Sequence, residues 1–443
     1  MADDDRFYVK TLTLENFRCF ERLELTDLDP HFNLLIGENG AGKTSILLAL
    51  ANLFRPLAAR GGILASDRIL NKFDVRNGAP KDRLLPGSTL EYAAWTMTTA
   101  FKWYADELQV REDYTLLPSL SSGSISRVGS DRRVTDIGGG FSNEILSLRH
   151  ELLAHYSVDR RFIRPANANQ QDESTDPTHP AYRNWLTAGA SATYLREWFR
   201  DLTLRALQSE RRANQDHRPA ETALAFVAEA VTAANPDATK IEYDGELLDI
   251  VVYDSIGKTH PFASMSAGQK ALTGLVVDIA YRAFSLNGEL YGARTLKETT
   301  GLVLIDEIDL HLHPKWQRQI VGALKNIFPK IQFFATTHSP QVIGEARPEE
   351  IVLLTKDGKQ KRPASSFGMD SNWVLECVMD AEGRDPEIAK RVRSVFNAID
   401  DDQFEAARAE IARLRKDIGE APDILGAEAY MWRIEHEADE VAE

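Results

Sequence analysis

The sequence predicts an α/β protein with a mostly parallel central sheet, and three short apolar runs carry that prediction. Residues 32–36, 301–305 and 331–334 are almost continuously apolar, as expected for strands that are buried on both faces. The first run precedes a helical pattern at 44–54, and the second precedes one at 308–327. Strands that alternate with helices are typical of parallel sheets, because each helix returns the chain to the edge from which it started.

Other segments extend this framework. Further strands are expected at 9–17, 23–25 and 92–104. Further helices are expected at 183–233 with a break near 209–220, at 264–285, and twice within the amphipathic stretch that begins at 386. Residues 241–254 predict a hairpin that turns at Asp244-Gly245. Exposed loops are expected at 121–135, which is rich in Ser, Gly and Arg, and at the polar stretch 165–181.

The composition is that of a globular protein. Of the 443 residues, 43% are hydrophobic and 27% are charged, and no apolar run approaches the roughly 20 residues that a spanning helix needs. The acidic start MADDDRFYVK lacks the pattern of a signal peptide. The two cysteines, Cys19 and Cys377, predict no disulfide framework, and we expect both thiols to be buried in a reducing compartment. We therefore expect a cytoplasmic protein with no membrane partner.

A glycine-rich loop between the first apolar run and its helix predicts a phosphate site. Residues 37–44, GENGAGKT, match the pattern G-x-x-x-x-G-K-[ST]. In such a loop, backbone N–H groups surround the β-phosphate, the lysine reaches the β- and γ-phosphates, and the threonine hydroxyl ligates Mg²⁺. The strand–loop–helix context favours this interpretation over a chance glycine-rich turn. The candidate nucleotide ligands are Gly37, Asn39, Gly40, Ala41, Gly42, Lys43, Thr44 and Ser45.

Two carboxylates follow the second apolar run, at the strand end where open α/β sheets bind ligands. Asp306 would hold Mg²⁺ together with Thr44, and Glu307 would polarise the attacking water. A solvated acidic strand end is the simpler alternative. His338 follows the third run and is interpreted as a sensor of the γ-phosphate, although a lone histidine is more often structural.

Ser266, Ala267, Gly268 and Gln269 open the helix expected at 264–285. Serine and glycine at a helix N-terminus form an anion site from free N–H groups and the helix dipole. By themselves such residues are only a good N-cap. Their place between the glycine-rich loop and the two carboxylates favours a phosphate-binding role.

These four motifs together resemble those of the ABC ATPase superfamily, in particular its RecF, SMC, Rad50 and OLD-like members. The resemblance implies an ATPase head that binds ATP and Mg²⁺ and works as a head-to-tail dimer, in which the signature Ser266–Gln269 of one copy covers the nucleotide of the other. It also implies a nucleotide contact from Arg18, within LENFRCF at 14–20. His311 and His313 are interpreted as residues of the dimer interface rather than as a metal pair.

The same resemblance predicts a head with a mostly parallel core sheet, an antiparallel β lobe, an inserted helical lobe and a C-terminal helical tail. The first part of the head, with the glycine-rich loop and the β lobe, is expected at 1–160. A loop and helical insertion is expected at 161–240, the second part of the head at 241–360, and the tail at 361–443.

A narrower resemblance is to the ATPase subunit of Septu-type and retron-associated antiphage systems. It rests on residues 155–161, 306–316, 333–342 and 396–400. It implies a nuclease partner supplied by another chain, such as an HNH endonuclease, and it allows an oligomer larger than a dimer. Glycine is common in place of Ala267, and alanine is tolerated there only if a positive φ is not required. The sequence does not identify the glutamine of a Q-loop.

Two other functions stay open at this point. A RecF-like repair clamp would act directly on DNA, but a net charge of −15 disfavours this because phosphates are bound by clustered Lys and Arg. A nuclease fused in the same chain, as in OLD proteins with a Toprim domain, is disfavoured because the largely helical residues after His338 lack separated acidic clusters. Contact with nucleic acid is therefore expected to be indirect.

Overall fold

The computed structural model describes residues 7–58, 83–84, 91–92, 94–103, 106–118, 125–136, 151–158, 180–182, 185, 188, 193–211, 219–235, 237–355, 358–381 and 384–440. The chain divides into two compact units, Met1–Asp370 and Ser371–Glu443. None of the described helices combines the length and the apolar character that crossing a bilayer requires.

A six-stranded core sheet forms the centre of the first unit. Its strand order is β16-β15-β3-β14-β13-β9, and every neighbouring pair is parallel except β15 with β16. The strands are β3 (Phe32–Gly37), β9 (Leu152–Tyr156), β13 (Gly301–Ile305), β14 (Ile331–Thr336), β15 (Ile351–Leu354) and β16 (Gln360–Lys361). The three apolar runs are therefore the adjacent strands β3, β14 and β13, which confirms the predicted parallel core.

A second sheet is antiparallel, with the order β2-β1-β6-β7-β8. Its strands are β1 (Tyr8–Phe17), β2 (Phe20–Leu25), β6 (Ala94–Trp103), β7 (Asp106–Pro118) and β8 (Ile125–Asp136). The predicted loop at 121–135 is wrong from Ile125 onward, where the chain forms β8. The β propensity of this polar segment is low, and the strand forms because its backbone pairs with β7. A separate two-stranded ladder joins β4 (Arg83–Leu84) to β5 (Glu91–Tyr92).

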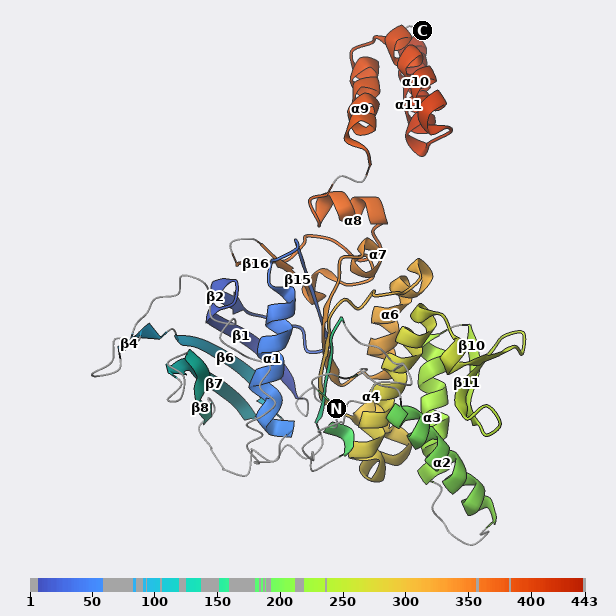
Figure 1. Cartoon of the computed structure of the whole chain (residues 1–443). Coiled ribbons are helices and arrows are strands. Elements are labelled where there is room, and N and C mark those ends of the chain that lie inside the picture. Colours follow the sequence, from blue (N-terminus) through green and yellow to red (C-terminus); the bar gives the residue numbers. More distant parts are fainter. Residues whose placement is uncertain are drawn as a thin grey trace. The chain divides into compact units, whose positions relative to one another are not determined.

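Helix α1 (Lys43–Ala58) lies between the two sheets and contacts strands of both (Figure 1). Its residues Leu47, Leu50 and Phe54 are buried in one hydrophobic cluster with Leu14 of β1 and Leu304 of β13. Figure 1 shows the remaining large helices of this unit on the other side of the core sheet. The helices after α1 are α2 (Thr193–Arg211), α3 (Pro219–Ala234), α4 (Ala267–Tyr291), α5 (Thr295–Glu298), α6 (Pro314–Ile327) and α7 (Pro340–Ile343).

The loop before α6 corrects one predicted boundary. Helix α6 begins at Pro314 rather than at 308. The preceding residues form turns, in which His311 has a left-handed φ of 64°. His313 is the N-cap residue, and Pro314 takes the first helical position, where a missing N–H costs no hydrogen bond.

The predicted hairpin exists, but its turn differs from the expected one. Strands β10 (Ala238–Asp244) and β11 (Asp249–Asp254) pair with Asp244 opposite Asp249, so four residues form the turn. The Asp244 carboxylate accepts hydrogen bonds from the N–H groups of Glu246 and Leu247, and the positive φ falls on Leu248 rather than on Gly245. Strand β12 (Thr259–Pro261) completes this small antiparallel sheet.

The second unit is helical, with α8 (Ser371–Cys377), α9 (Pro386–Asp400), α10 (Phe404–Ile418) and α11 (Pro422–Glu440). The sequence prediction of two helices after 386 missed α11. The apolar stripes of α9 and α10 pack with α11 into one cluster that includes Ile399, Ile411 and Met431. The expectation of buried thiols is also wrong, since Cys19 and Cys377 are both exposed.

Candidate active site

A cavity of about 490 Å³ lies where the carboxyl ends of β3, β13 and β14 meet. Its walls are the glycine-rich loop after β3, the two carboxylates after β13 and the segment after β14, because these strands are parallel neighbours. The turn between β1 and β2 adds Arg18 and Cys19. The predicted residues that the structure brings together around this cavity are Arg18, Asn39, Gly40, Gly42, Lys43, Thr44, Ser45, Asp306, Glu307 and His338. Gly37 and Ala41 belong to the same loop without lining the cavity.

The glycine-rich loop curls around the Lys43 side chain. The Lys43 ammonium donates to the carbonyl oxygens of Gly37 at 2.8 Å and Glu38 at 3.0 Å. Burial lowers the pKa of Lys43, while the negative charges of Asp306 and Glu307 act in the opposite direction. The two carbonyl oxygens hold the Lys43 ammonium inside the loop, at the start of α1, where helix N–H groups already favour an anion.

Gly42 permits the close contact between this loop and the turn from β1 to β2. Its φ is +93°, and a Cβ atom at this position would lie 2.2 Å from the Phe20 ring and 2.6 Å from the Cys19 sulfur. Any other residue would push these two elements apart and strain the backbone. The glycine thus keeps Arg18 and Cys19 at the wall of the cavity.

Asp306 is held by hydrogen bonds to both carboxylate oxygens and to its backbone. The Thr44 hydroxyl donates to Oδ2 at 2.8 Å, and the Thr336 hydroxyl donates to Oδ1 at 2.6 Å. Its N–H donates to the carbonyl oxygen of Tyr156 at 2.8 Å. The Thr44 hydroxyl and the Asp306 carboxylate are oxygen ligands of the kind that Mg²⁺ prefers, so this pair fits a magnesium site.

The sequence interpretation missed two residues that line this cavity, Cys19 and Thr336, and of these Thr336 bonds both carboxylate residues. Its hydroxyl also accepts a hydrogen bond from the Glu307 N–H at 2.7 Å, and thereby joins the two carboxylate residues. Glu307 has a left-handed φ of 51°, a strained conformation for a residue with a side chain. A threonine at the end of β14, next to a strand that ends in two carboxylates, was the available signal.

His338 carries an imidazole that favours the neutral form. Burial lowers its pKa first, and the positive charge of Lys43 lowers it further, against the opposing effect of Asp309, Glu307 and Asp306. A neutral imidazole can donate one hydrogen bond and accept another. The side chain therefore suits contact with a phosphate oxygen.

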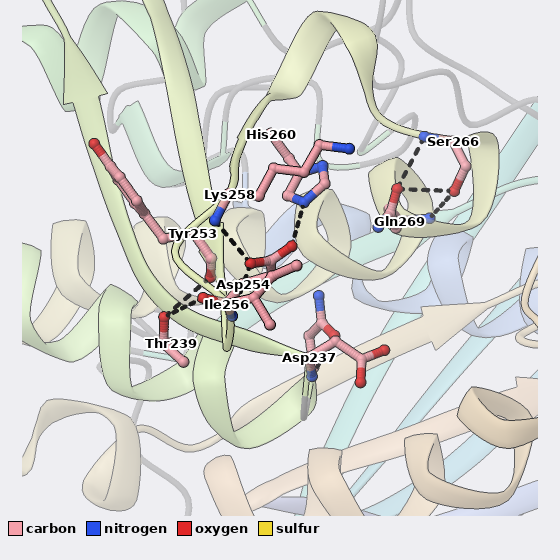
Figure 2. Close-up of polar contacts among 10 residues, drawn as sticks. Asp237, Thr239, Tyr253, Asp254, Ile256, Lys258, His260, Ser266 and Gln269 are labelled. Atoms are coloured by element: carbon pink, nitrogen blue, oxygen red, sulfur yellow. Dashed lines mark hydrogen bonds and ion pairs between the residues drawn. The ribbon is translucent and has the colours of Figure 1, made fainter.

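The signature segment lies at the start of α4, where Ser266 is the N-cap residue. The Ser266 hydroxyl accepts from the Gln269 N–H at 3.3 Å, and the Gln269 side-chain oxygen accepts from the Ser266 N–H at 3.1 Å (Figure 2). Ala267 is the first helical residue and is not among those with a positive φ, so alanine meets the condition stated for this position.

Asp254, the last residue of β11, accepts several hydrogen bonds from the segment that leads through β12 to the signature. Its carboxylate accepts from the N–H groups of Ile256 at 3.0 Å and Lys258 at 2.9 Å, and it lies 2.9 Å from the His260 ring (Figure 2). The hydrogen bond with His260 lowers the pKa of Asp254. Strand β12 ends at Pro261, and one turn of 3-10 helix, Phe262–Ser264, separates it from the signature.

A second cavity, of about 650 Å³, contains the signature. It is lined by Asp237, Ser266, Ala267, Gly268, Gln269, His311, Leu312, His313, Lys315 and Trp316. Gly268 allows the turn before α6 to approach α4, since a Cβ atom there would lie 2.3 Å from the His311 carbonyl oxygen. The His313 ring accepts from the Lys315 N–H at 3.3 Å, which caps α6. Lys315 in turn pairs with Asp237 at 3.0 Å.

Comparison with known proteins agrees with this geometry. The model of the family described as "AAA domain, putative AbiEii toxin, Type IV TA system" matches residues 32–344, which include both cavities' principal motifs. The chain belongs to this family. It is an ABC-type ATPase, and the fold predicted from the sequence is the one observed.

Individual relatives share about a quarter to a third of their aligned residues with this ATPase. It is 26% identical to the "Retron Ec83 probable ATPase" of Escherichia coli over 502 residues, an alignment that covers 98% of this chain and 89% of that protein. It is 34% identical to the "Septu protein PtuA" of Bacillus thuringiensis over 149 residues, which covers 32% of this chain and 36% of that protein. The SMC head domain from Thermotoga maritima aligns over 80% of this chain and 97% of its own, with 14% identity and a TM-score of 0.43.

Proposed function

We propose that this ATPase hydrolyses Mg²⁺-ATP as a head-to-tail dimer and thereby controls a nuclease that another chain of an antiphage complex supplies. One observation supports the proposed dimer. The cavity of the glycine-rich loop and the cavity of the signature share no lining residue among those described. A serine-capped helix N-terminus without a nucleotide of its own is explained if it serves the nucleotide of a second copy.

Within one head, each side chain of the first cavity has a distinct task. Lys43 binds the β- and γ-phosphates, and Thr44 and Asp306 would hold Mg²⁺, which when bound stabilises the charge on the phosphoryl oxygens. Glu307 orients the attacking water, and Thr336 orients Glu307 through its backbone N–H. A neutral His338 would hydrogen-bond the γ-phosphate. The partner copy would complete the site with Ser266 and the N-terminus of its α4.

The role in defence is supported by the relatives rather than by the cavity. The retron relative aligns along nearly the whole chain, and the Septu relative aligns over about a third of it, at 98% and 32%. These relatives are named for a retron and for a Septu system, respectively. The net charge of −15 also suits a chain that acts on another protein more than one that coats nucleic acid.

A mixture of two inactive variants tests the shared site. Lys43→Ala removes the phosphate-binding ammonium, and Ser266→Arg blocks the signature. In a mixed head-to-tail dimer, one site carries both defects and the other carries neither. We therefore expect the mixture to recover part of the wild-type turnover, while each variant alone stays inactive. A wild-type monomer that turns over ATP at full rate, whatever the protein concentration, would contradict the dimer.

The nuclease assignment has its own test. The purified chain should leave plasmid DNA, linear duplex and RNA intact with Mg²⁺ or Mn²⁺ present. Cleavage that survives purification and disappears when residues of this chain are mutated would place the nuclease in this protein. Tight DNA binding by the isolated chain, together with DNA-stimulated turnover, would instead favour a repair clamp that acts directly on DNA.

A further inference from the structure

Tyr156, the last residue of strand β9, forms hydrogen bonds with Asp306 at the first cavity and with Asp278 of α4, the helix that the signature opens. In the sheet it lies opposite Ile305, the residue before the two carboxylates. Its carbonyl oxygen accepts the N–H of Asp306 at 2.8 Å. Its side-chain hydroxyl donates to Asp278 Oδ2 at 2.6 Å, and Asp278 belongs to α4, the helix that the signature opens.

Because the bonded groups are buried, the hydrogen bond between Tyr156 and Asp278 fixes the position of α4 relative to β9. Tyr156 and Asp278 have no exposed surface, and Arg282 is 1% exposed. Arg282 Nε donates to the same Asp278 oxygen at 3.0 Å, and its Nη1 donates to the Ala181 carbonyl oxygen at 2.6 Å. Water cannot replace these partners inside the protein, so a buried carboxylate strongly favours the one placement that keeps them. Helix α4 is thereby tied to β9 at Asp278.

The tie reaches the signature because α4 is continuous. Asp278 lies about 16 Å along the helix axis from Ala267, at the usual rise per residue. A helix moves as a stiff element over this length, so a shift at Asp278 is passed to Ser266. A displacement of Asp306 reaches the same helix through Tyr156 alone, which bonds both Asp306 and Asp278.

We propose that Tyr156 is a positioning residue that couples the ATP site of a head to the signature of the same head. The coupling rests on the proposed head-to-tail dimer, in which these two regions serve two different nucleotides. Occupancy of one site then sets the position of the signature that completes the other site. Tyr156 touches no nucleotide itself.

Tyr156→Phe tests the coupling, with Tyr182→Phe as the matched control. The first variant loses the hydroxyl that bonds Asp278 and keeps both the ring and the carbonyl that holds Asp306. The second also loses a buried tyrosine hydroxyl, which donates to the Glu151 carbonyl oxygen at 2.7 Å. We expect both variants to bind nucleotide with wild-type affinity. Tyr156→Phe should lower kcat about 10-fold, the size of a typical coupling between sites, and Tyr182→Phe should not lower it.

Two further readouts separate positioning from a general loss of structure. In a Glu307→Gln background, ATP should trap much less dimer with Tyr156→Phe than with Tyr182→Phe. In dilute, monomeric wild-type protein, added nucleotide should slow amide exchange in residues 275–285 of α4 as well as in residues 37–44. Tyr156→Phe should abolish the first response and keep the second.

The outcomes distinguish this coupling from the dimer on which it rests. Equal kcat and equal dimer trapping in the two variants would refute the role of Tyr156, even where wild-type turnover depends on protein concentration. If Tyr156→Phe does not fold, the wild-type exchange experiment decides, and an α4 that does not respond to nucleotide overturns the coupling. Concentration-independent turnover by a wild-type monomer refutes the dimer itself.

Discussion

Replacing Thr336 by valine should slow catalysis while leaving nucleotide binding intact. Thr336 is 1% exposed, and its hydroxyl bonds the Asp306 carboxylate at 2.6 Å and the Glu307 N–H at 2.7 Å. Valine has almost the same shape, so the substitution removes both hydrogen bonds without opening a cavity. The left-handed backbone of Glu307 then loses the contact that stabilises it.

The expected size follows from these two bonds. A hydrogen bond to a charged group contributes about 1.5–3 kcal/mol, and a buried N–H without an acceptor costs about 1–3 kcal/mol. Asp306 keeps the bond from Thr44 to its other oxygen, so we expect the free energy of unfolding to fall by about 3 kcal/mol, near the lower end of the sum. If about 2 kcal/mol of this loss acts on the placement of Glu307, kcat falls about 30-fold.

Phosphate release, nucleotide titration and denaturant unfolding together measure these effects. Thr336→Ser keeps the hydroxyl and should restore most of kcat. Thr299→Val is the matched control, because Thr299 is also buried and its hydroxyl donates to Thr295 at 2.7 Å and accepts from Asn287 at 3.1 Å, away from the cavity. It should lower stability and leave kcat unchanged. Wild-type kcat in Thr336→Val, or an equal loss of kcat in Thr299→Val, would refute the reasoning.

The remaining predictions concern nucleotide binding, turnover and their dependence on pH. Lys43→Ala should abolish ATP binding in a titration, whereas Glu307→Gln should bind ATP, lose turnover and accumulate a dimer on size-exclusion chromatography; wild-type hydrolysis by Glu307→Gln would show that Glu307 is not the catalytic carboxylate. Gly268→Ala should clash with the His311 carbonyl, displace the turn before α6 and lower kcat without weakening ATP binding, and Gly322→Ala, where a Cβ meets nothing within 4 Å, is its control. Because the pKa of His338 is lowered, the imidazole stays neutral as the pH falls past about 6.5, the ordinary value. Turnover should therefore persist at that pH and decline only below it. The contribution of His338 to folding stability should decrease over the same acidic range. A pH–rate profile unchanged by His338→Gln would contradict this role.

Contiguous motifs could be predicted from the sequence because their residues are neighbours along the chain. The glycine-rich loop, the apolar strands and the serine that caps α4 are local patterns, and local backbone geometry is enough to specify them. The membership of β3, β13 and β14 in one parallel sheet also followed, since strands that alternate with helices form such a sheet. For this reason most of the residues that line the cavity of the glycine-rich loop were among the predicted site residues.

Contacts between distant residues were decided only by the tertiary structure. Thr44 and Asp306 are 262 positions apart, and Tyr156 and Asp278 are 122 apart, so no local pattern predicts their hydrogen bonds. The strand at Ile125–Asp136 exists because β7 pairs with it, against its own weak propensity. The apolar stripes after 386 are covered by a third helix of the same unit rather than by another surface. In each case the residue types were visible in the sequence, and only strand order and helix packing determined which partner each of them meets.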